Sequence, residues 1–270
     1  MPDTPDLDAY FQRIGFAAAP EPSLTTLREL HRLHPNAIPF ENLSTLIGDP
    51  VPLDLPALQR KLVVERRGGY CFEQNRLFAA VLGSIGFDVT ALAARVVWNR
   101  VDAALGPRTH MVLLVEVGGE THLCDVGFGG LTLTGPLLLE TDVEQVTPHE
   151  TLRLARRDGD FLVEASVRGD WRALYRFDLQ VQLPIDFDVL NHFVATHPDS
   201  PFRSTLMAAR RTPGGGYALR DNELSIYADG EKEQRLLTSA MDIENVLVET
   251  FGIRLPATPA LRDALERIAG

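Results

Sequence analysis

One cysteine lies in a segment that suits nucleophilic chemistry. Cys71 ends the run Arg67-Gly68-Gly69-Tyr70-Cys71, and an apolar helical pattern resumes directly after it. Because glycines permit a sharp backbone bend, the run predicts that Cys71 lies at or near the N-terminus of a helix. The unpaired N–H groups there carry partial positive charge, which favours the thiolate, the reactive form of cysteine. Position alone leaves open that Cys71 is a small apolar residue packed in the core.

A predicted hairpin supplies a base and an acid. Two strand-like segments, 109–117 and 120–127, are joined by two glycines, which is typical of a tight turn. With this turn, His110 and Asp125 fall on one face as diagonal neighbours, about 7–8 Å apart at the backbone and within hydrogen-bonding reach. An imidazole oriented by a carboxylate is what a general base requires. One bulged residue in the hairpin would place the two side chains on opposite faces.

The same register separates the two cysteines of the chain. Cys124 falls on the face opposite His110, together with Met111 and Leu113. We therefore expect Cys124 in the hydrophobic core, which leaves Cys71 as the nucleophile.

Other histidines have the spacing of metal ligands. His31 and His34 fit one face of a helix, and His122 closely precedes Cys124 and Asp125. No further cysteine pair or set of three histidines accompanies them, so the sequence predicts no metal site. We expect His31 and His34 at a solvated helix edge and His122 on the sheet face opposite His110.

The hydrophobic period changes once along the chain. Up to about residue 86 it is helical, and from Val89 it is two, which is typical of strands. Glycine-containing turns separate the strands, so we expect an antiparallel run that forms a small barrel. A mixed segment at 188–211 has a helical start at Asn191, and the triple glycine after it indicates a turn. Helices are predicted at 8–14, 54–64, 71–86, 239–254 and 258–269, and a further one begins at a capping box of Thr26 and Glu29. Strands are predicted at 89–98, 109–117, 121–126, 151–156, 161–167 and 171–177.

Composition argues against several classes of protein. The 270 residues carry a formal net charge of -11 with a pI near 5.1, and such a protein would repel nucleic acid. No window of about 18 apolar residues could span a membrane. The start of the chain, Met1–Asp8, lacks the basic and apolar regions of a signal peptide. Two cysteines are too few for a disulfide framework, so we expect a reducing cytoplasm.

Several blocks of the sequence, taken together and in order, resemble a known family. The resemblance runs from about Tyr10 to Leu255. It is to the arylamine N-acetyltransferases, whose three signature blocks are matched by Arg67–Asn75, Thr109-His110 and Asp125–Gly130, with further matches at Ile38–Leu43 and at Asn191–Arg210, which includes Ser200-Pro201-Phe202.

The resemblance implies a fold and a reaction. The fold is α+β with a cysteine-protease-like core: a helical bundle at 1–87, an antiparallel β-barrel at 88–190, an interdomain segment at 191–211 and an α/β lid at 212–270. The reaction is ping-pong and needs no metal. Acetyl-coenzyme A acylates the cysteine, coenzyme A leaves, and an arylamine, arylhydrazine or N-hydroxyarylamine takes the acetyl group. Such an enzyme serves xenobiotic metabolism and acts on small molecules, as a monomer or a homodimer.

The resemblance also assigns individual residues. It implies a catalytic triad of Cys71, His110 and Asp125, and a buried pair of Arg67 with Glu41 that braces the loop before the cysteine. Phe40, Val96, Phe128 and Phe202 match positions that line the apolar pocket, although core packing explains Val96 equally well. Thr109, Gly129 and Gly130 match positions on the coenzyme A side, where no basic run resembles a strong phosphate clamp.

Three other functions remain open. Relatives in the same family act as amide synthases on a carrier-bound acyl chain, with the same triad and a different donor. Hydrolases and transglutaminases also place Cys, His and Asp or Asn in this order along the chain. A binding module with an inert, buried Cys71 is the third alternative.

Overall fold

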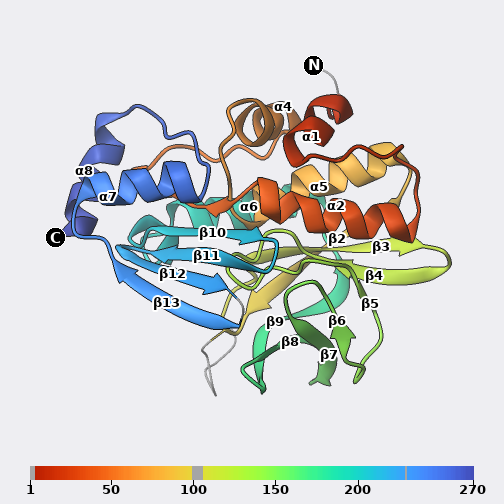
Figure 1. The fold of residues 1–270 in the computed structure, drawn as a ribbon. Coiled ribbons are helices and arrows are strands. Elements are labelled where there is room, and N and C mark those ends of the chain that lie inside the picture. Colours follow the sequence, from red (N-terminus) through yellow and green to blue (C-terminus); the bar gives the residue numbers. More distant parts are fainter. Residues whose placement is uncertain (1–3, 99–105, 229) are drawn as a thin grey trace.

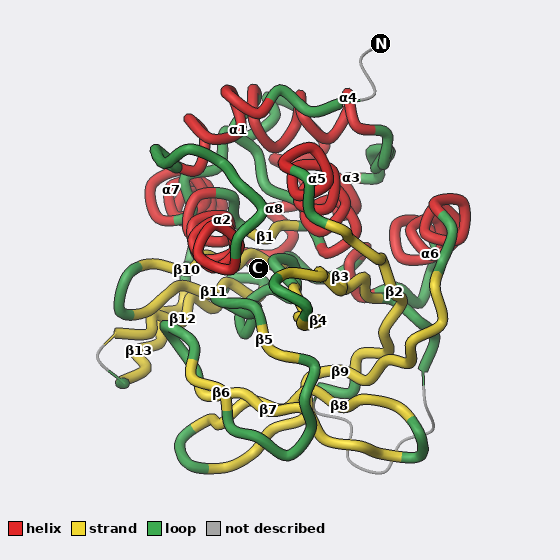
Figure 2. Tube along the Cα trace, turned by 90° about the vertical axis from the view of Figure 1, so that its right-hand side faces the viewer, coloured by secondary structure: helices red, strands yellow, loops and turns green. Residues whose placement is uncertain are grey.

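The structure is a computed structural model that describes residues 4–98, 106–228 and 230–270 (Figure 1). Met1–Asp3, part of the N-terminal stretch that we compared with signal peptides, lie outside the described residues. In Figure 1 the N-terminal helices form the upper layer, and two sheets lie beneath them. Figure 2 shows the barrel strands β6 to β9 at the bottom and the strands β10 to β13 at the left.

The N-terminal layer is helical, as predicted, but its second helix begins earlier than expected. The Ser23 side chain accepts a hydrogen bond from the Thr26 N–H at 3.2 Å, so the cap lies at Ser23 and the predicted capping box at Thr26 is wrong. The helix predicted at 54–64 forms over this range, but its second half is π-helical. The elements are α1 Leu7–Ile14, α2 Leu24–Ala37, α3 Leu43–Ile47, α4 Leu55–Leu58, η1 Gln59–Val64 and α5 Cys71–Ile85.

Eight antiparallel strands form a nearly closed barrel. Their order is β5-β4-β3-β2-β9-β8-β7-β6, so β5 and β6 are its edges. The Gln145 side chain joins these edges, because its amide accepts from Leu138 N at 2.7 Å and donates to Leu138 O at 2.9 Å. The strands are β2 Asp88–Val96, β3 His110–Val117, β4 Glu120–Cys124, β5 Leu137–Leu138, β6 Gln145–Val146, β7 Thr151–Arg157, β8 Asp160–Val167 and β9 Asp170–Val181.

The hairpin of β3 and β4 has the predicted register. Val117 pairs with Glu120 and Leu113 with Cys124, without a bulge between them. Gly118 and Gly119 have φ values of 64° and 82°, a left-handed pair that closes a two-residue turn in agreement with strand twist. The alternation of faces therefore continues unbroken to the end of β4.

A second sheet combines distant parts of the chain. Its order is β1-β10-β11-β12-β13, and its first strand, β1 Phe40–Glu41, comes from the helical layer. The turn predicted at the triple glycine joins β10 to β11, with Gly214 at a φ of 81°. The other elements are β10 Met207–Thr212, β11 Gly215–Arg220, β12 Glu223–Ala228, β13 Glu231–Leu236, α7 Ala240–Asn245, η3 Val246–Thr250 and α8 Pro259–Ala269.

The helix predicted to start at Asn191 starts earlier. Helix α6 is Pro184–Thr196, and the short 3-10 helix η2, Pro201–Arg203, follows it. Asp186 accepts a hydrogen bond from the Leu183 N–H at 2.8 Å, and Pro184 suits the first turn of a helix. The predicted boundary between residues 190 and 191 thus falls inside α6, and the division into four parts stays a prediction.

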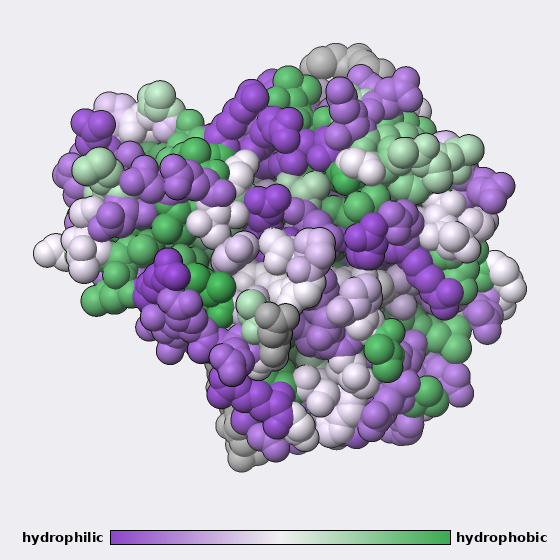
Figure 3. All heavy atoms as spheres, viewed as in Figure 1, coloured by the Kyte–Doolittle hydropathy of each residue, from purple (hydrophilic) through white to green (hydrophobic). Residues whose placement is uncertain are grey.

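Three hydrophobic clusters hold these layers together. One lies between the helices and the β3–β4 hairpin, and it includes Cys71 and Cys124. A second fills the barrel, and a third lies between the second sheet and the C-terminal helices. On the face drawn in Figure 3, hydrophilic and hydrophobic residues are interspersed. No helix in the described ranges combines the length and the apolar character needed to cross a membrane.

We predict that truncating a side chain inside the barrel destabilises the protein. Leu154 on β7 is fully buried, so Leu154→Ala should lower the free energy of unfolding by about 2–5 kcal/mol, because the lost methyl groups leave a cavity. Urea denaturation followed by circular dichroism measures this change. The matched control is Leu179→Ala on β9, where the side chain is 51% exposed and the change should stay within about 0.5 kcal/mol. Equal losses in both variants would contradict the assignment of the core.

Candidate active site

Helix α5 presents Cys71 as its first residue. The Glu73 carboxylate accepts a hydrogen bond from the Tyr70 N–H at 3.1 Å and so fixes the start of the helix. A Cβ on Gly68 would overlap the carbonyl oxygen of Pro39, and one on Gly69 would lie 2.6 Å from Glu73 Oε2. Gly68 is therefore required by close packing against the backbone of Pro39, and a side chain on Gly69 would displace the Glu73 carboxylate that fixes the start of α5.

The hairpin brings His110 and Asp125 to this cysteine. His110 begins β3, Asp125 directly follows β4, and His110 Nε2 lies 2.7 Å from Asp125 Oδ2. The Cys71 thiol points to the carbonyl oxygen of Thr109 at 3.6 Å, next to His110 in the chain. A Cβ on Gly127 would lie 2.7 Å from Cys71 Cα, so the segment after Asp125 packs directly against the cysteine. Since Nε2 faces the carboxylate, the second ring nitrogen, Nδ1, is left for the thiol.

Burial and charge shift the pKa values of His110 and Asp125 in opposite directions. Burial lowers the pKa of His110, but the charge of Asp125, its hydrogen bond and the contact with Cys71 together raise the pKa to about 10. Burial likewise raises the pKa of Asp125, and the hydrogen bonds and charge of His110 outweigh it, so this pKa is lowered. Both groups are therefore charged at neutral pH, in a place where the side chains are 2% and 0% exposed.

Asn75 connects α5 to β3 and to the segment that begins at Asp125, and sequence reasoning missed it. It lies one turn after Cys71 on α5, and its Nδ2 donates to Asp125 Oδ1 at 2.9 Å and to Met111 O at 2.7 Å. Its Oδ1 accepts from Val126 N at 3.0 Å. Asn75 follows two other polar residues at the start of an otherwise apolar helix, and this run could have indicated an inward-facing network.

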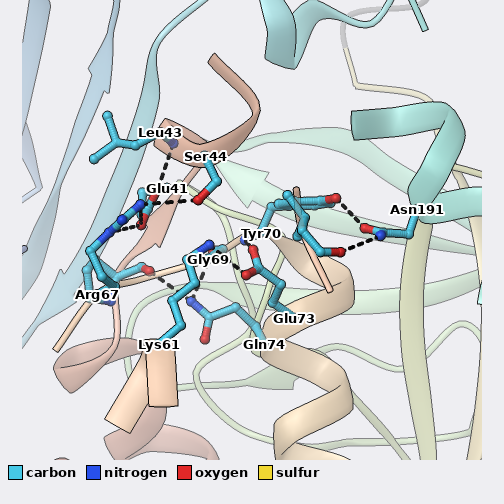
Figure 4. A network of polar contacts seen from close by, with 12 residues as sticks. Glu41, Leu43, Ser44, Lys61, Arg67, Gly69, Tyr70, Glu73, Gln74 and Asn191 are labelled. Carbon is cyan, nitrogen blue, oxygen red and sulfur yellow. Dashed lines mark hydrogen bonds and ion pairs between the residues drawn. The ribbon is translucent and has the colours of Figure 1, made fainter. Parts of the chain in front are cut away.

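The loop before Cys71 is held by two ion pairs, one buried and one half-buried (Figure 4). Arg67 donates from Nε to Glu41 Oε1 at 2.9 Å, and their side chains are only 9% and 0% exposed. Lys61 Nζ lies 2.6 Å from Glu73 Oε1. Burial raises the pKa of Glu73, although Lys61 opposes this. The structure thus brings Arg67 and Glu41 together as a buried pair, beside a second pair that the sequence did not reveal.

A further contact ties this loop to α6. The Tyr70 hydroxyl donates to Asn191 Oδ1, and Asn191 Nδ2 donates to Val51 O at 2.8 Å (Figure 4). Burial raises the pKa of Tyr70 far above its usual value, so the hydroxyl keeps its proton and remains a donor.

The three phenylalanines of the predicted pocket lie around His110 and the segment before Cys71. The ring of Phe128 lies 5.3 Å from that of His110, and the Phe40 ring lies 6.1 Å from that of Phe202. A Cβ on Gly129 would touch the Phe40 ring at 3.6 Å, so this ring faces the segment that carries Phe128. Phe40, Phe128 and Phe202 are each half-buried. Phe128 adjoins His110, whereas the Phe202 ring lies 5.6 Å from that of Tyr70, the residue before Cys71.

The other predicted binding residues lie at different distances from the thiol. Thr109 contacts it through its carbonyl oxygen. Gly130 is exposed and faces Ala218 of the second sheet. Val96 pairs with Tyr175 on β9, whose ring lies 4.8 Å from that of His110, so Val96 lies next to a neighbour of His110.

The expectation of a solvated position for His31 and His34 is wrong. Both imidazoles are 0% exposed, because this face of α2 packs onto Phe78 of α5. The prediction for His122 is confirmed: it pairs with Val115 and lies on the hairpin face opposite His110. In the ranges 4–98, 106–228 and 230–270, no three His, Cys, Asp or Glu side chains are grouped as metal ligands would be.

Comparisons with known proteins define the class. A family model described as N-acetyltransferase matches residues 23–260. The arylamine N-acetyltransferase of Mycolicibacterium smegmatis is 44% identical over 268 residues, which cover 98% of this chain and 97% of the relative. That of Escherichia coli is 42% identical over 252 residues, which cover 93% of this chain and 89% of the relative. The class is therefore that of enzymes that transfer acyl groups.

Solved structures agree with the sequence matches. The Mycobacterium marinum arylamine N-acetyltransferase in complex with CoA superposes with a TM-score of 0.95 at 40% identity, covering 98% of this chain and 100% of that one. The expected α+β class, with its cysteine-protease-like core, is confirmed by this likeness and by the barrel. The chain belongs to the arylamine N-acetyltransferase family.

We predict that breaking the buried pair before Cys71 is costly. Glu41→Gln leaves the Arg67 guanidinium buried without a carboxylate, and this should lower the free energy of unfolding by about 3–5 kcal/mol. Denaturation in urea measures the loss. In the control Glu29→Gln, the lost pair with Arg32 is exposed, with Glu29 at 43%, so the change should be below about 1 kcal/mol. A loss below about 1 kcal/mol in Glu41→Gln would contradict a bracing role for the pair.

Proposed function

We propose that the protein transfers an acetyl group from acetyl-coenzyme A to an arylamine, arylhydrazine or N-hydroxyarylamine through an acetyl-cysteine at Cys71. The observation that carries this proposal is the buried series of thiol, imidazole and carboxylate in a chain of this family. Cys71 is the nucleophile, His110 the general base and acid, and Asp125 the group that orients and charges the imidazole. The Arg67–Glu41 pair serves as structural support for the loop.

In the first half-reaction, Cys71 reacts as a thiolate beside the imidazolium of His110. The sulfur attacks the carbonyl carbon of the acetyl thioester and forms a new C–S bond. The bond to the coenzyme A sulfur breaks, and this sulfur leaves with the proton that the imidazolium donates. In the resting enzyme, the Asp125 carboxylate stabilises the protonated form of His110. The carboxylate is itself held in place by hydrogen bonds from Asn75 and from Gly127 N, each at 2.9 Å.

In the second half-reaction, the amine nitrogen attacks the acetyl carbonyl carbon. His110 accepts a proton from the amine, and the Cys71 sulfur leaves as a thiolate, so the resting ion pair is restored. Aromatic amines are weak bases and enter as neutral molecules, which suits the aromatic side chains of Phe128 beside His110 and of Phe40 and Phe202.

Acetyl-coenzyme A is the donor that the relatives suggest, since a related structure is described as a complex with CoA. We assign Thr109, Gly129 and Gly130 to the donor side, where small residues let the coenzyme approach the backbone. We assign Val96, the strand partner of Tyr175, to the acceptor side. Two unpaired cysteines fit a reducing compartment, and we propose the cytoplasm and a role in xenobiotic metabolism.

We predict that acyl transfer depends wholly on Cys71. The wild-type protein, given acetyl-coenzyme A and a panel of arylamines and arylhydrazines, should release free thiol in proportion to the amine consumed, and Cys71→Ala should release none. Matched Cys124→Ala should keep its turnover, because Cys124 is the core cysteine. Continued thiol release without amine, beyond one equivalent per enzyme, or cleavage of peptides, would favour the hydrolase. Turnover only with a carrier-bound acyl chain would favour the amide synthase.

We predict a distinctive pH profile for alkylation of Cys71 by iodoacetamide. The pKa of His110 is raised to about 10, so its positive charge is kept below that pH and lost above it. The wild-type rate should therefore vary little between about pH 7 and 9. In His110→Gln the rate should be lower near neutral pH and should rise with pH, as expected of a thiol without a charged partner. His192→Gln, an exposed control on α6, should behave as wild type. A steep wild-type profile would contradict the ion pair.

A further inference from the structure

The proposed mechanism makes no use of two buried titratable side chains on α2. His31 and His34 lie one turn apart on α2, and both are fully buried. Burial lowers their pKa values to about 4 and about 3, so both rings are uncharged at neutral pH. An uncharged imidazole has one donor and one acceptor, and a buried ring is placed by the partners of these two atoms.

His31 contacts the main chain of Asp125. Its Nε2 accepts a hydrogen bond from the Asp125 N–H at 3.1 Å. Because an N–H can only donate, Nε2 is unprotonated and the ring proton lies on Nδ1. The ladder between β3 and β4 ends at Leu113 and Cys124, so Asp125 is the first residue beyond the paired strand. His31 thus takes the place of a strand partner where the chain leaves the sheet.

The position of the Asp125 main chain determines where its carboxylate lies. On one side His31 holds the N–H, and on the other the Thr132 hydroxyl donates to Asp125 O at 3.1 Å. The carboxylate between them is 2.7 Å from His110 Nε2. A shift of the Asp125 backbone would lengthen this contact and weaken the support for the imidazolium.

His34 acts on the other side of the site, through Gln74. The His34 ring lies 2.7 Å from the Gln74 Oε1 atom through Nε2 and 2.7 Å from the Tyr10 hydroxyl through Nδ1. Since an amide oxygen only accepts, Nε2 donates and Nδ1 accepts from Tyr10. Gln74 Nε2 then donates to Pro39 O at 2.8 Å and to Gly69 O at 3.2 Å. Figure 4 shows Gln74 facing Gly69, two residues before the nucleophile.

We infer that α2 supplies two positioning residues to the triad: His31 sets the main chain of Asp125, and His34 sets, through Gln74, the loop that carries Cys71. This inference rests on the proposed function of the triad. The hydrogen bonds are donated in one direction: from the Tyr10 hydroxyl to His34, from His34 to Gln74, and from Gln74 to the carbonyl oxygens of Pro39 and Gly69. The contact of His31 with Asp125 comes from the same face of α2. Helix α2 therefore fixes the distance between the segment that carries Cys71 and the segment that carries Asp125.

The test for His31 separates positioning from mere stability. The Nδ1 atom of His31 has no hydrogen-bond partner among the described residues, so His31→Leu exchanges one unpaired buried N–H for another, that of Asp125. We expect a Tm within a few degrees of wild type. We expect kcat to fall by about 10- to 100-fold with an unchanged KM for the amine, because misplacement by about 1 Å has effects of this order. The alkylation rate of Cys71 should become steeply dependent on pH, as in His110→Gln.

The matched control is His122→Leu. His122 is also buried and lies on β4, and its ring makes no hydrogen bond to Cys71, His110 or Asp125 in the described part of the chain. It should keep the wild-type kcat and the flat alkylation profile. If His31→Leu keeps both as well, or if His122→Leu loses both to the same extent, the role of His31 is overturned. The role of His31 is also overturned if His31→Leu has a lower Tm but keeps the flat pH profile of Cys71 alkylation.

The test for His34 uses rescue by a conservative variant. His34→Gln keeps an acceptor for Tyr10 and a donor for Gln74, whereas His34→Leu keeps neither. We expect kcat to fall in His34→Leu and to recover in His34→Gln, and equal values in both would overturn the relay. Iodoacetamide alkylation needs neither acyl donor nor amine. If no amine is acetylated, the proposed function fails, while the alkylation profiles still decide whether α2 positions the triad.

Discussion

The buried hydrogen bond between His110 and Asp125 is the interaction on which the site depends. Two charges without access to water are costly unless each lies close to a partner and the remaining lone pairs are occupied. The Asp125 carboxylate meets this condition with three donors: His110 on one oxygen, and Asn75 and the Gly127 N–H on the other. The site can therefore hold a charged imidazole beside a thiol inside the protein.

Such an arrangement requires that neighbouring polar groups face inward. Asn75 and Gln74 point from α5 into the layer between helices and barrel, where they satisfy backbone groups of β3 and of the loop before Cys71. Glu73 does the same at the start of α5, with Lys61 as its counter-charge. These side chains replace hydrogen bonds that water would otherwise supply, so the interior of the helical layer is both polar and closed.

The structure also shows why the positions of two histidines were misjudged. A spacing of three residues places His31 and His34 on one face of a helix, but it does not tell which face meets solvent. The neighbouring leucines of α2 allow either orientation of a broad apolar face, and the packing of α5 decides it. The same limit applies to α6. A local cap accounts for its start at Pro184, but the contact of its Asn191 with Tyr70 forms only in the folded chain.

Local signals in the sequence were sufficient for the elements that carry Cys71, His110 and Asp125. The two glycines of the hairpin set the register of β3 and β4, and thereby the shared face of His110 and Asp125, because a two-residue turn leaves one pairing. The start of α5 at Cys71 followed from the change of pattern after Gly69. Only the tertiary structure decided what surrounds them: the pairing of β1 with β10, the contact of Asn191 with Tyr70, and the approach of α2 to Asp125. These contacts join residues far apart in the chain, and their partners are chosen by the packing of whole layers, to which no short stretch of sequence is sensitive.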